Sequence, residues 1–251
     1  MIDRIPKERF DGDHYLGRPA DFTDLIVRRR VELVKQIPGF WGKDLTLVDV
    51  GCGNGASMFL LADYFDHLQG LEIFSENEKA FNEIKKQTGI TNCDFKVIDI
   101  ETQPWPVLYD RLISFEVIEH LTNDTNTDKF LQLLKPGGMA AITVPNKWWI
   151  FETHGAKLPL LPWNRVPFFS WLPRPMHEKW ANARIYTKAR IEKTLRKAGF
   201  EIIESKYVTA PLDVLKESKF KTWIQDNFFP NHTTKIPIKS TAIFIVAKRP
   251  K

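Results

Sequence analysis

The chain has 251 residues, 43% of them hydrophobic, and a formal net charge of +5 from 36 Lys and Arg against 31 Asp and Glu. That apolar content is ample for a core and excludes a disordered protein, while the mild, dispersed positive charge points only weakly to nucleic acid or an anionic membrane. Two cysteines without CxxC spacing predict a reducing compartment, and a charged N-terminus without any apolar run of membrane-spanning length predicts a soluble, cytoplasmic protein.

The predicted elements begin with an amphipathic helix over residues 21–37, which ends before the Pro38-Gly39 pair. Strands and helices then alternate, and this pattern predicts an α/β fold with a doubly wound, mostly parallel sheet. The predicted elements are strand 45–50, helix 56–65, strand 68–73, helix 75–87, strands 94–99 and 110–115, helix 124–134 and strand 139–144. Ligands of such sheets bind at the carboxyl ends of the strands.

A glycine-rich turn, VDVGCGNG, lies between the first predicted strand and the helix that follows it. Glycine there permits positive φ and close approach of a ligand to the main chain, and the helix N-terminus offers unpaired N–H groups. This arrangement predicts a nucleotide-like ligand. A dinucleotide site usually reads GxGxxG or GxGxxA, whereas the spacing here is GxGxG.

Two ligand classes fit such a sheet: nicotinamide or flavin dinucleotides, and S-adenosylmethionine. The acidic residues at the strand ends help to distinguish them. Asp49 beside the loop would repel a pyrophosphate but attract the ammonium and sulfonium groups of S-adenosylmethionine. Glu72 lies 72 − 51 = 21 residues after Gly51, where an acid can accept both ribose hydroxyls, and both ligand classes use such an acid. Asp99 follows the third predicted strand and could face an adenine amino group or cap the local turn. The sequence thus favours S-adenosylmethionine.

Five successive segments resemble the signature segments of class I S-adenosylmethionine-dependent methyltransferases. They are VDVGCGNG, GLEIFSE, FKVIDIE, YDRLISFEVIEHL and LLKPGGMAAITVPN. The resemblance is close over residues 45–146 and looser through residues 186–208. The EVIEHL and LLKPGG forms are most similar to the branch that contains the ubiquinone-pathway O-methyltransferases and many small-molecule or glycan methyltransferases.

The resemblance implies which residues line the cofactor site. Phe115 and Glu116, just past the fourth strand, would face the methyl group. The other implied cofactor-binding residues are Asp49, Gly51, Cys52, Gly53, Glu72, Ile73, Asp99 and Ile100.

The resemblance also implies a single domain with a seven-stranded sheet whose last strand, 241–247, is antiparallel and lies next to strand 201–208. Within it we distinguish an N-terminal helical segment 1–44, a cofactor-binding core 45–145, an aromatic insertion 146–182 and a C-terminal part 183–251. A further insertion, 209–240, is expected to form a helix over the active-site end. Its expected apolar anchors are Leu212, Leu215, Phe220, Trp223, Phe228 and Phe229.

The 146–182 insertion is rich in proline and aromatic residues. Its prolines, at 159, 162, 167, 173 and 175, exclude one long helix. Its aromatic residues include Trp148, Trp149, Trp163, Phe168, Phe169 and Trp171. Three interpretations stay open: a lid over the acceptor, a membrane-surface patch that uses Lys157, Arg165 and Arg174, or a plain extension of the core. We favour the lid, over an apolar or lipid-like acceptor.

Methyl transfer to a hydroxyl benefits from a general base, and histidine is the usual choice. His120, His154 and His177 are the candidates, of which we single out His120 and His177 as catalytic. Glu116, Glu119 and His120 could instead share a divalent metal, as in some ubiquinone-pathway relatives. We expect no metal there, because hard cations often need more oxygen ligands, and we expect activity to survive chelation.

These features predict a methyltransferase that acts on an oxygen of a small or lipid-like molecule. A methyltransferase of sugar or glycan intermediates is the second possibility. A nucleic-acid methyltransferase is disfavoured, because the chain has neither a concentrated basic stripe nor an Asn/Asp-Pro-Pro-aromatic motif after the fourth strand. A non-catalytic binding protein would be expected to lose cofactor acids such as Asp49 and Glu72.

Overall fold

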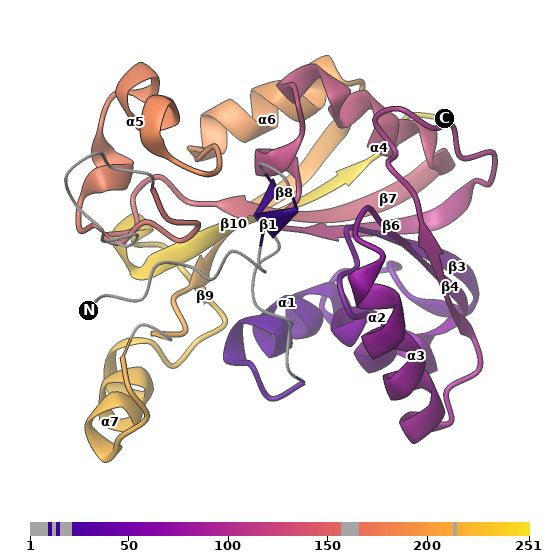
Figure 1. Ribbon diagram of the computed structural model, residues 1–251, viewed down its shortest axis with the longest axis horizontal. Coiled ribbons are helices and arrows are strands. Elements are labelled where there is room, and N and C mark those ends of the chain that lie inside the picture. Colours follow the sequence, from indigo (N-terminus) through magenta and orange to yellow (C-terminus); the bar gives the residue numbers. More distant parts are fainter. Residues whose placement is uncertain (1–9, 12–13, 16–21, 157–165, 213–214) are drawn as a thin grey trace.

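A computed structural model describes residues 10–11, 14–15, 22–156, 166–212 and 215–251. Its centre is a sheet of eight strands in the order β5-β4-β3-β6-β7-β10-β8-β9 (Figure 1). The strands are β3 (Gly42–Val50), β4 (Phe65–Glu72), β5 (Cys93–Val97), β6 (Tyr109–Phe115), β7 (Leu134–Pro145), β8 (Glu201–Thr209), β9 (Thr233–Thr234) and β10 (Ser240–Lys248). A separate two-stranded hairpin pairs β1 (Phe10–Asp11) with β2 (His14–Tyr15).

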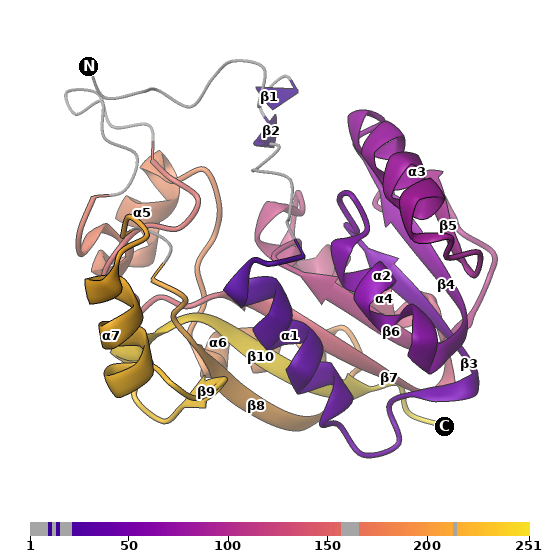
Figure 2. The ribbon, with the colours of Figure 1, turned by 90° about the horizontal axis from the view of Figure 1, so that it is seen from below.

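Helices cover both faces of the sheet. Figure 1 and Figure 2, which is seen from below, place α1, α2 and α3 on one face, and α4 and α6 on the other. The helices are α1 (Leu25–Lys35), α2 (Ala56–Leu61), α3 (Glu76–Thr88), α4 (Asp128–Gln132), α5 (Arg174–Trp180), α6 (Lys188–Lys197) and α7 (Lys219–Phe228). None of the helices in the described ranges is long and apolar enough to cross a bilayer.

The core is divided between the two faces because successive side chains of a strand point in opposite directions. Leu47 of β3 packs in the cluster that contains α1, α2 and α3 residues, whereas Val48 and Val50 pack with Phe130 of α4 and Leu195 of α6. Strands β3, β4, β6 and β7 are therefore buried on both sides, which explains their continuous apolar runs. The predicted α/β, mostly parallel architecture is confirmed.

The C-terminal part of the sheet contains antiparallel strands, as expected. The whole sheet has eight strands, one more than the seven expected. Strand β10 lies between β7 and β8 and is antiparallel to both. The extra strand is β9, whose two residues, Thr233 and Thr234, pair with Val208 and Tyr207 at the sheet edge. Residues of the 209–240 insertion form it, so it lies outside the pattern that the resemblance implied.

Three predicted helices are shorter than expected. The helix predicted over 21–37 extends only over Leu25–Lys35, and strand pairing shortens the other two. The helix predicted over 56–65 ends at Leu61 and continues as the 3-10 helix η2 (Ala62–Tyr64), because residues from Phe65 onward already pair with β3. The helix predicted over 124–134 begins as the 3-10 helix η4 (Asp124–Thr127) before α4, and Leu134 already pairs with Tyr109 of β6. In both cases strand pairing ends the helix before the apolar pattern does.

The 209–240 insertion does contain a helix, α7, but most of its expected anchors are wrong. Leu215, Phe220, Trp223 and Phe228 are 40–66% exposed, and among the six only Leu212 is fully buried. The insertion is held partly by an apolar cluster in which Leu212 and Phe229 pack with Trp149. It is also held by the buried guanidinium of Arg29 in α1, which donates hydrogen bonds to the carbonyl oxygens of Thr209, Ala210 and Phe229. Figure 1 shows α7 standing away from the sheet at its lower left.

Candidate active site

A cavity of about 1190 Å³ lies at the carboxyl ends of the parallel strands. One part of its wall is the glycine-rich turn together with the ends of β4, β5 and β6. The other part comes from α1, from residues 149–154 after β7, and from Lys221 and Gln225 of α7. Both insertions therefore reach the cavity, which is where loops that leave parallel strands were expected to lie.

All ten residues that the sequence predicted at the cofactor site line this one cavity. They are Asp49, Gly51, Cys52, Gly53, Glu72, Ile73, Asp99, Ile100, Phe115 and Glu116. They come from four successive strand ends, so the topology brings together residues that are up to 67 positions apart, 116 − 49 = 67. Their individual contacts with a cofactor remain predictions.

The glycine-rich turn is shaped by a carboxylate at the end of β4. The Glu72 carboxylate accepts hydrogen bonds from the backbone N–H groups of Gly53 (2.7 Å), Ile73 (2.9 Å) and Phe74 (3.1 Å). Gly51 has φ of +72°, and a Cβ there would lie 2.3 Å from Cγ2 of Val117. Only glycine fits that position without displacing the cavity wall.

Two buried acids beside this turn create a site for positive charge. Burial raises the pKa of Asp49 well above its usual value, and the charge of Glu72 adds to the rise. Burial also raises the pKa of Glu72, although its three backbone hydrogen bonds oppose that shift. A cationic ligand would favour the ionised acids, so this wall fits the ammonium and sulfonium of S-adenosylmethionine better than a pyrophosphate.

Asp99 has the local role that the sequence left open. Its Oδ1 accepts a hydrogen bond from the N–H of Glu101 at 2.9 Å, and its Oδ2 accepts one from the Thr102 hydroxyl at 2.8 Å. Asp99 therefore caps the turn after β5 while it also lines the cavity. The cap and a contact with adenine do not exclude each other, because each carboxylate oxygen can accept two hydrogen bonds.

A group of two acids and two histidines, which we call the acid–histidine cluster, lies just past the end of β6. Its members are Glu116, Glu119, His120 and His154. Nε2 of His154 lies 3.3 Å from Oε1 of Glu119 and 3.9 Å from Oε2 of Glu116. The rings of His120 and His154 have centroids 5.0 Å apart. Arg30 of α1 pairs with Glu116 at 3.0 Å.

The two carboxylates of the acid–histidine cluster are held in an unfavourable environment. Burial raises the pKa of both, and Glu119 is shifted well above its usual value with a further contribution from the Glu116 charge. Neither oxygen of Glu119 has a hydrogen-bond partner of good geometry among the described residues. Glu116 also has φ of +60°, which is strained for a residue other than glycine. Such features concentrate at functional sites.

Three members of the acid–histidine cluster could hold a metal ion. Glu119, His120 and His154 each offer one ligand atom, and these atoms lie within 4.8 Å of one another. The sequence suggested Glu116, Glu119 and His120 for this role. The structure adds His154, which is supplied by the 146–182 insertion rather than by the EVIEH segment.

His177 does not line the cavity, so the structure does not support a contact between this predicted catalytic residue and the acceptor. It is fully buried, and its Nε2 lies 2.7 Å from Oε2 of Glu152. The other oxygen of Glu152 accepts a hydrogen bond from the backbone N–H of His154 at 3.2 Å. His177 therefore supports the turn that places His154.

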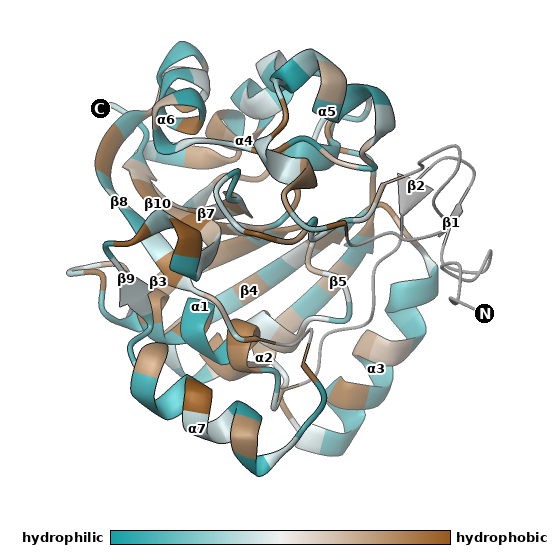
Figure 3. Ribbon diagram, turned by 90° about the vertical axis from the view of Figure 1, so that its left-hand side faces the viewer, coloured by the Kyte–Doolittle hydropathy of each residue, from teal (hydrophilic) through white to brown (hydrophobic). Residues whose placement is uncertain are grey.

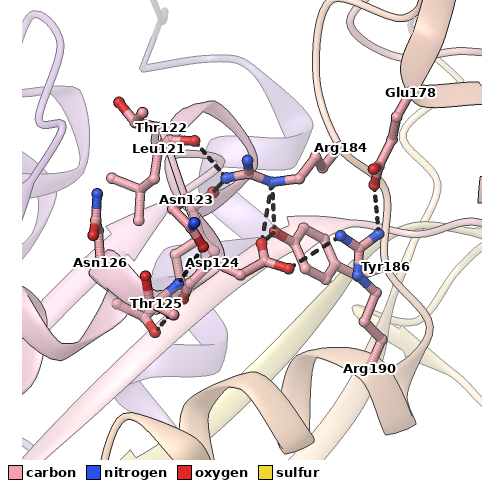
Figure 4. A network of polar contacts seen from close by, with 12 residues as sticks. Leu121, Thr122, Asn123, Asp124, Thr125, Asn126, Glu178, Arg184, Tyr186 and Arg190 are labelled. Carbon is pink, nitrogen blue, oxygen red and sulfur yellow. Dashed lines mark hydrogen bonds and ion pairs between the residues drawn. The ribbon is translucent and has the colours of Figure 1, made fainter. Parts of the chain in front are cut away.

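A polar network fixes the segment that carries Glu119 and His120 (Figure 4). The Arg184 guanidinium donates hydrogen bonds to the carbonyl oxygens of Ile118 (2.9 Å) and Leu121 (2.6 Å). The backbone N–H of Arg184 donates a hydrogen bond to the carbonyl oxygen of Glu119. Asp124 holds Arg184 in turn through an ion pair of 3.1 Å. Sequence reasoning missed Arg184 because no motif marks it and these partners are 60 to 66 residues away in the chain.

The described part of the 146–182 insertion is divided between the cavity, the core and the surface. Trp149 lines the cavity, and Phe169 is buried. Trp148, Phe168 and Trp171 are 39–52% exposed. Residues named in the sequence interpretation that lie outside the described ranges are Lys157, Pro159, Pro162, Trp163 and Arg165.

Comparison with known proteins shows which family this chain is similar to. A family model described as a methyltransferase domain matches residues 42–199. A ubiquinone biosynthesis O-methyltransferase of Bradyrhizobium sp. (strain ORS 278) is 28% identical over 142 residues, which cover 53% of this chain and 51% of that protein. One of the same name from Rickettsia canadensis (strain McKiel) is 28% identical over 243 residues, 91% of this chain and 95% of that protein.

The chain thus spans about half the length of the first curated relatives it matches. An S-adenosylmethionine-dependent methyltransferase structure from Mesorhizobium loti matches 91% of this chain and all of that one, with a TM-score of 0.62 and 14% identity, which shows a shared fold. Since the family model covers most of the chain, and the glycine turn and its acids lie within the match, the chain belongs to the methyltransferase domain family, as a class I S-adenosylmethionine-dependent member related to the ubiquinone biosynthesis O-methyltransferases.

Proposed function

We propose that the chain transfers a methyl group from S-adenosylmethionine to an oxygen atom of a small, apolar or lipid-like molecule. The observation that carries this proposal is that one cavity joins the acid-lined glycine turn to the acid–histidine cluster. The first part fits a cationic methyl donor, and the second offers groups that can accept a proton. The word O-methyltransferase in the relatives' name supports oxygen as the acceptor atom.

The apolar side chains of the cavity support a lipid-like acceptor. They come from α1, from the end of β6 and from the 146–182 insertion, and include Leu25, Ile26, Val27, Phe115, Trp149 and Phe151. An apolar acceptor would be stabilised there by about 25 cal/mol for each Å² of apolar surface removed from water. In this proposal the 146–182 insertion acts as a lid, because Trp149 and Phe151 can bury the acceptor and exclude water.

Bound S-adenosylmethionine supplies an electrophilic methyl carbon, which the acceptor oxygen attacks as the bond from carbon to sulfur breaks. In the proposed mechanism Asp49 and Glu72 hold the donor, and the cavity wall places the acceptor in line with the methyl group. His154 accepts the proton of the acceptor hydroxyl, and Glu119 orients its imidazole and stabilises the imidazolium that forms. His120 is the alternative base, since its ring lies against that of His154.

A test of the proposed acceptor class uses labelled S-adenosylmethionine and a cell extract that is separated into lipid, polar-metabolite and RNA fractions. We expect the lipid fraction to take up label, because apolar side chains of α1 and of the 146–182 insertion line part of the cavity. A glycan-intermediate methyltransferase would label the polar fraction instead. Label confined to RNA would contradict the proposal.

A second candidate is a metal-assisted transfer. It is favoured by the buried Glu119 carboxylate, which lies 3.3 Å from Nε2 of His154 but has no hydrogen bond of good geometry among the described residues. Glu119, His120 and His154 would hold the cation, whose charge would offset their burial and lower the pKa of the acceptor hydroxyl. A site with few protein ligands can still bind Mg²⁺, because this ion usually keeps several water ligands. The residues therefore fit a cation as well as a proton acceptor.

Chelation separates the two candidates. Under the proposed metal-free mechanism, dialysis against a chelator should leave the transfer rate unchanged, because histidine itself accepts the proton. Loss of activity that added magnesium restores would establish the second candidate and contradict the first. A Glu119→Gln variant provides the control, since it should abolish any magnesium dependence.

A further inference from the structure

Three aromatic residues of α7, Phe220, Trp223 and Phe228, form an exposed cluster that the cavity does not use. Their side chains are 66%, 53% and 50% exposed. The ring of Trp223 lies 6.2 Å from that of Phe220, stacked at 15°, and 5.6 Å from that of Phe228. We call these three residues the α7 aromatic cluster. Large apolar side chains gathered on a surface in this way mark an interaction site.

Other residues of α7 contribute to the cavity. Lys221 and Gln225 line it, and Lys221 is 6% exposed, in contrast to its neighbours Phe220 and Thr222. The helix therefore contributes Lys221 and Gln225 to the cavity, while its three aromatic residues are exposed and do not line the cavity. Figure 3 shows hydrophobic and hydrophilic residues alternating along α7, at the lower edge of that view.

The charge around the α7 aromatic cluster is positive. Residues 215–239 contain five lysines against two acids, a local balance of 5 − 2 = +3. Lys216, Lys219 and Lys235 are exposed, and the ammonium of Lys239 lies 5.8 Å from the centre of the Phe228 ring. Of the two acids, Glu217 pairs with Lys221. Aromatic side chains flanked by lysines suit the boundary between headgroups and acyl chains of an anionic bilayer.

We propose that the α7 aromatic cluster and its lysines bind an anionic lipid surface. A projecting helix can insert its rings between headgroups without a matching groove on a partner, and the flanking lysines then face the lipid phosphates. Two isoleucines of the following segment, Ile236 and Ile238, are 49% and 39% exposed and add apolar surface near Lys239. This membrane contact differs from one through the 146–182 insertion, because α7 belongs to the 209–240 insertion.

Under the proposed function, this binding would also bring a cavity for lipid-like acceptors to the bilayer that contains them. Vesicle binding itself requires neither cofactor nor acceptor. The membrane contact and the proposed reaction can therefore fail independently of each other.

The test is sedimentation of the protein with vesicles of phosphatidylcholine mixed with phosphatidylglycerol, and with vesicles of phosphatidylcholine alone. We expect binding to the anionic vesicles, a loss of roughly tenfold or more in the triple variant Phe220→Ser, Trp223→Ser and Phe228→Ser, and weaker binding at high salt. The matched control replaces three other exposed apolar residues, Val107, Leu108 and Ile203, with serine. These residues are 42–52% exposed and lie outside the cavity and α7. This control should bind like the wild type.

A second variant, Lys216→Glu with Lys219→Glu, keeps the three rings and guards against misfolding of the triple variant. Lys219 is the first residue of α7, where an acid is compatible with the helix dipole. This variant should lose anionic-vesicle binding while its melting temperature and affinity for S-adenosylmethionine stay unchanged. The proposal is overturned if the wild type does not sediment with anionic vesicles, if both variants bind like the wild type, or if the cluster instead mediates self-association without lipid.

Discussion

Replacement of His154 by alanine is expected to lower kcat by about 10²–10⁴-fold, the range typical for loss of a general base. The physical reason is the position of its imidazole, with Nε2 3.3 Å from the buried Glu119 carboxylate and its ring on the cavity wall. Affinity for S-adenosylmethionine should change little, because Asp49 and Glu72 lie at the glycine turn. Single-turnover kinetics with labelled donor measures the rate, and calorimetry measures the affinity.

Two further histidine variants control this experiment. His120→Ala should lower kcat less than His154→Ala if His154 is the base, and a reversed order would transfer that role to His120. His177→Gln should give a kcat between those of the wild type and His154→Ala, because His177 acts on the site only through Glu152. A His154→Ala enzyme with wild-type kcat would contradict the proposed proton acceptor.

Replacement of Glu72 by alanine is expected to weaken S-adenosylmethionine binding by about 1–3 kcal/mol, a factor of roughly 5–150. The variant loses the proposed acceptor of the ribose hydroxyls. It also leaves the N–H groups of Gly53, Ile73 and Phe74 without the carboxylate that now holds the turn. Calorimetric titration measures the change, and Glu78→Ala, an exposed acid of the neighbouring α3, is the control.

Binding should also depend on pH. The pKa of Asp49 is raised in the free protein, so at low pH this acid is protonated and must lose its proton before it can favour the cationic donor. Affinity should therefore fall as the pH decreases, and binding should release protons, which titration in buffers of different ionisation enthalpy detects. Affinity that is unchanged by Glu72→Ala and by pH would contradict the assigned cofactor wall.

The cofactor half of the site could be predicted because its features are local in sequence. A buried strand, a glycine turn and a helix adjoin one another, and parallel pairing then places Asp49, Glu72 and Asp99 at neighbouring strand ends. The alternation of strands and helices is sufficient for that inference.

The acceptor half could not be predicted in the same way. His154 lies beside Glu119 because of the conformation of the 146–182 insertion. That conformation could not be predicted, because the insertion has no periodic pattern of apolar residues. Arg30 and Lys221 come from opposite ends of the chain, and nothing local marks either as a cavity residue. His177 is buried against Glu152 and has a supporting role. The sequence alone does not distinguish such a histidine from a catalytic one.

The orientation of α7 illustrates the same limit. Apolar residues at helical spacing indicate an amphipathic helix, but periodicity does not say whether the apolar side faces the protein or the surroundings. Phe220 and Trp223 were expected to anchor the helix, whereas the hydrogen bonds of Arg29 hold the insertion and leave those rings exposed. The hydrogen bonds of Arg29 join residues that are 180 to 200 positions apart in the chain.

The most direct test of the proposed function is to identify the methylated atom. The protein would be incubated with a lipid extract and S-adenosylmethionine that carries a deuterated methyl group, and products would be analysed by mass spectrometry and NMR. We predict a lipid-soluble product with the deuterated methyl group bound to oxygen, and its loss in the His154→Ala variant. A deuterated methyl group on nitrogen or carbon, or one found only in RNA, would contradict the proposal.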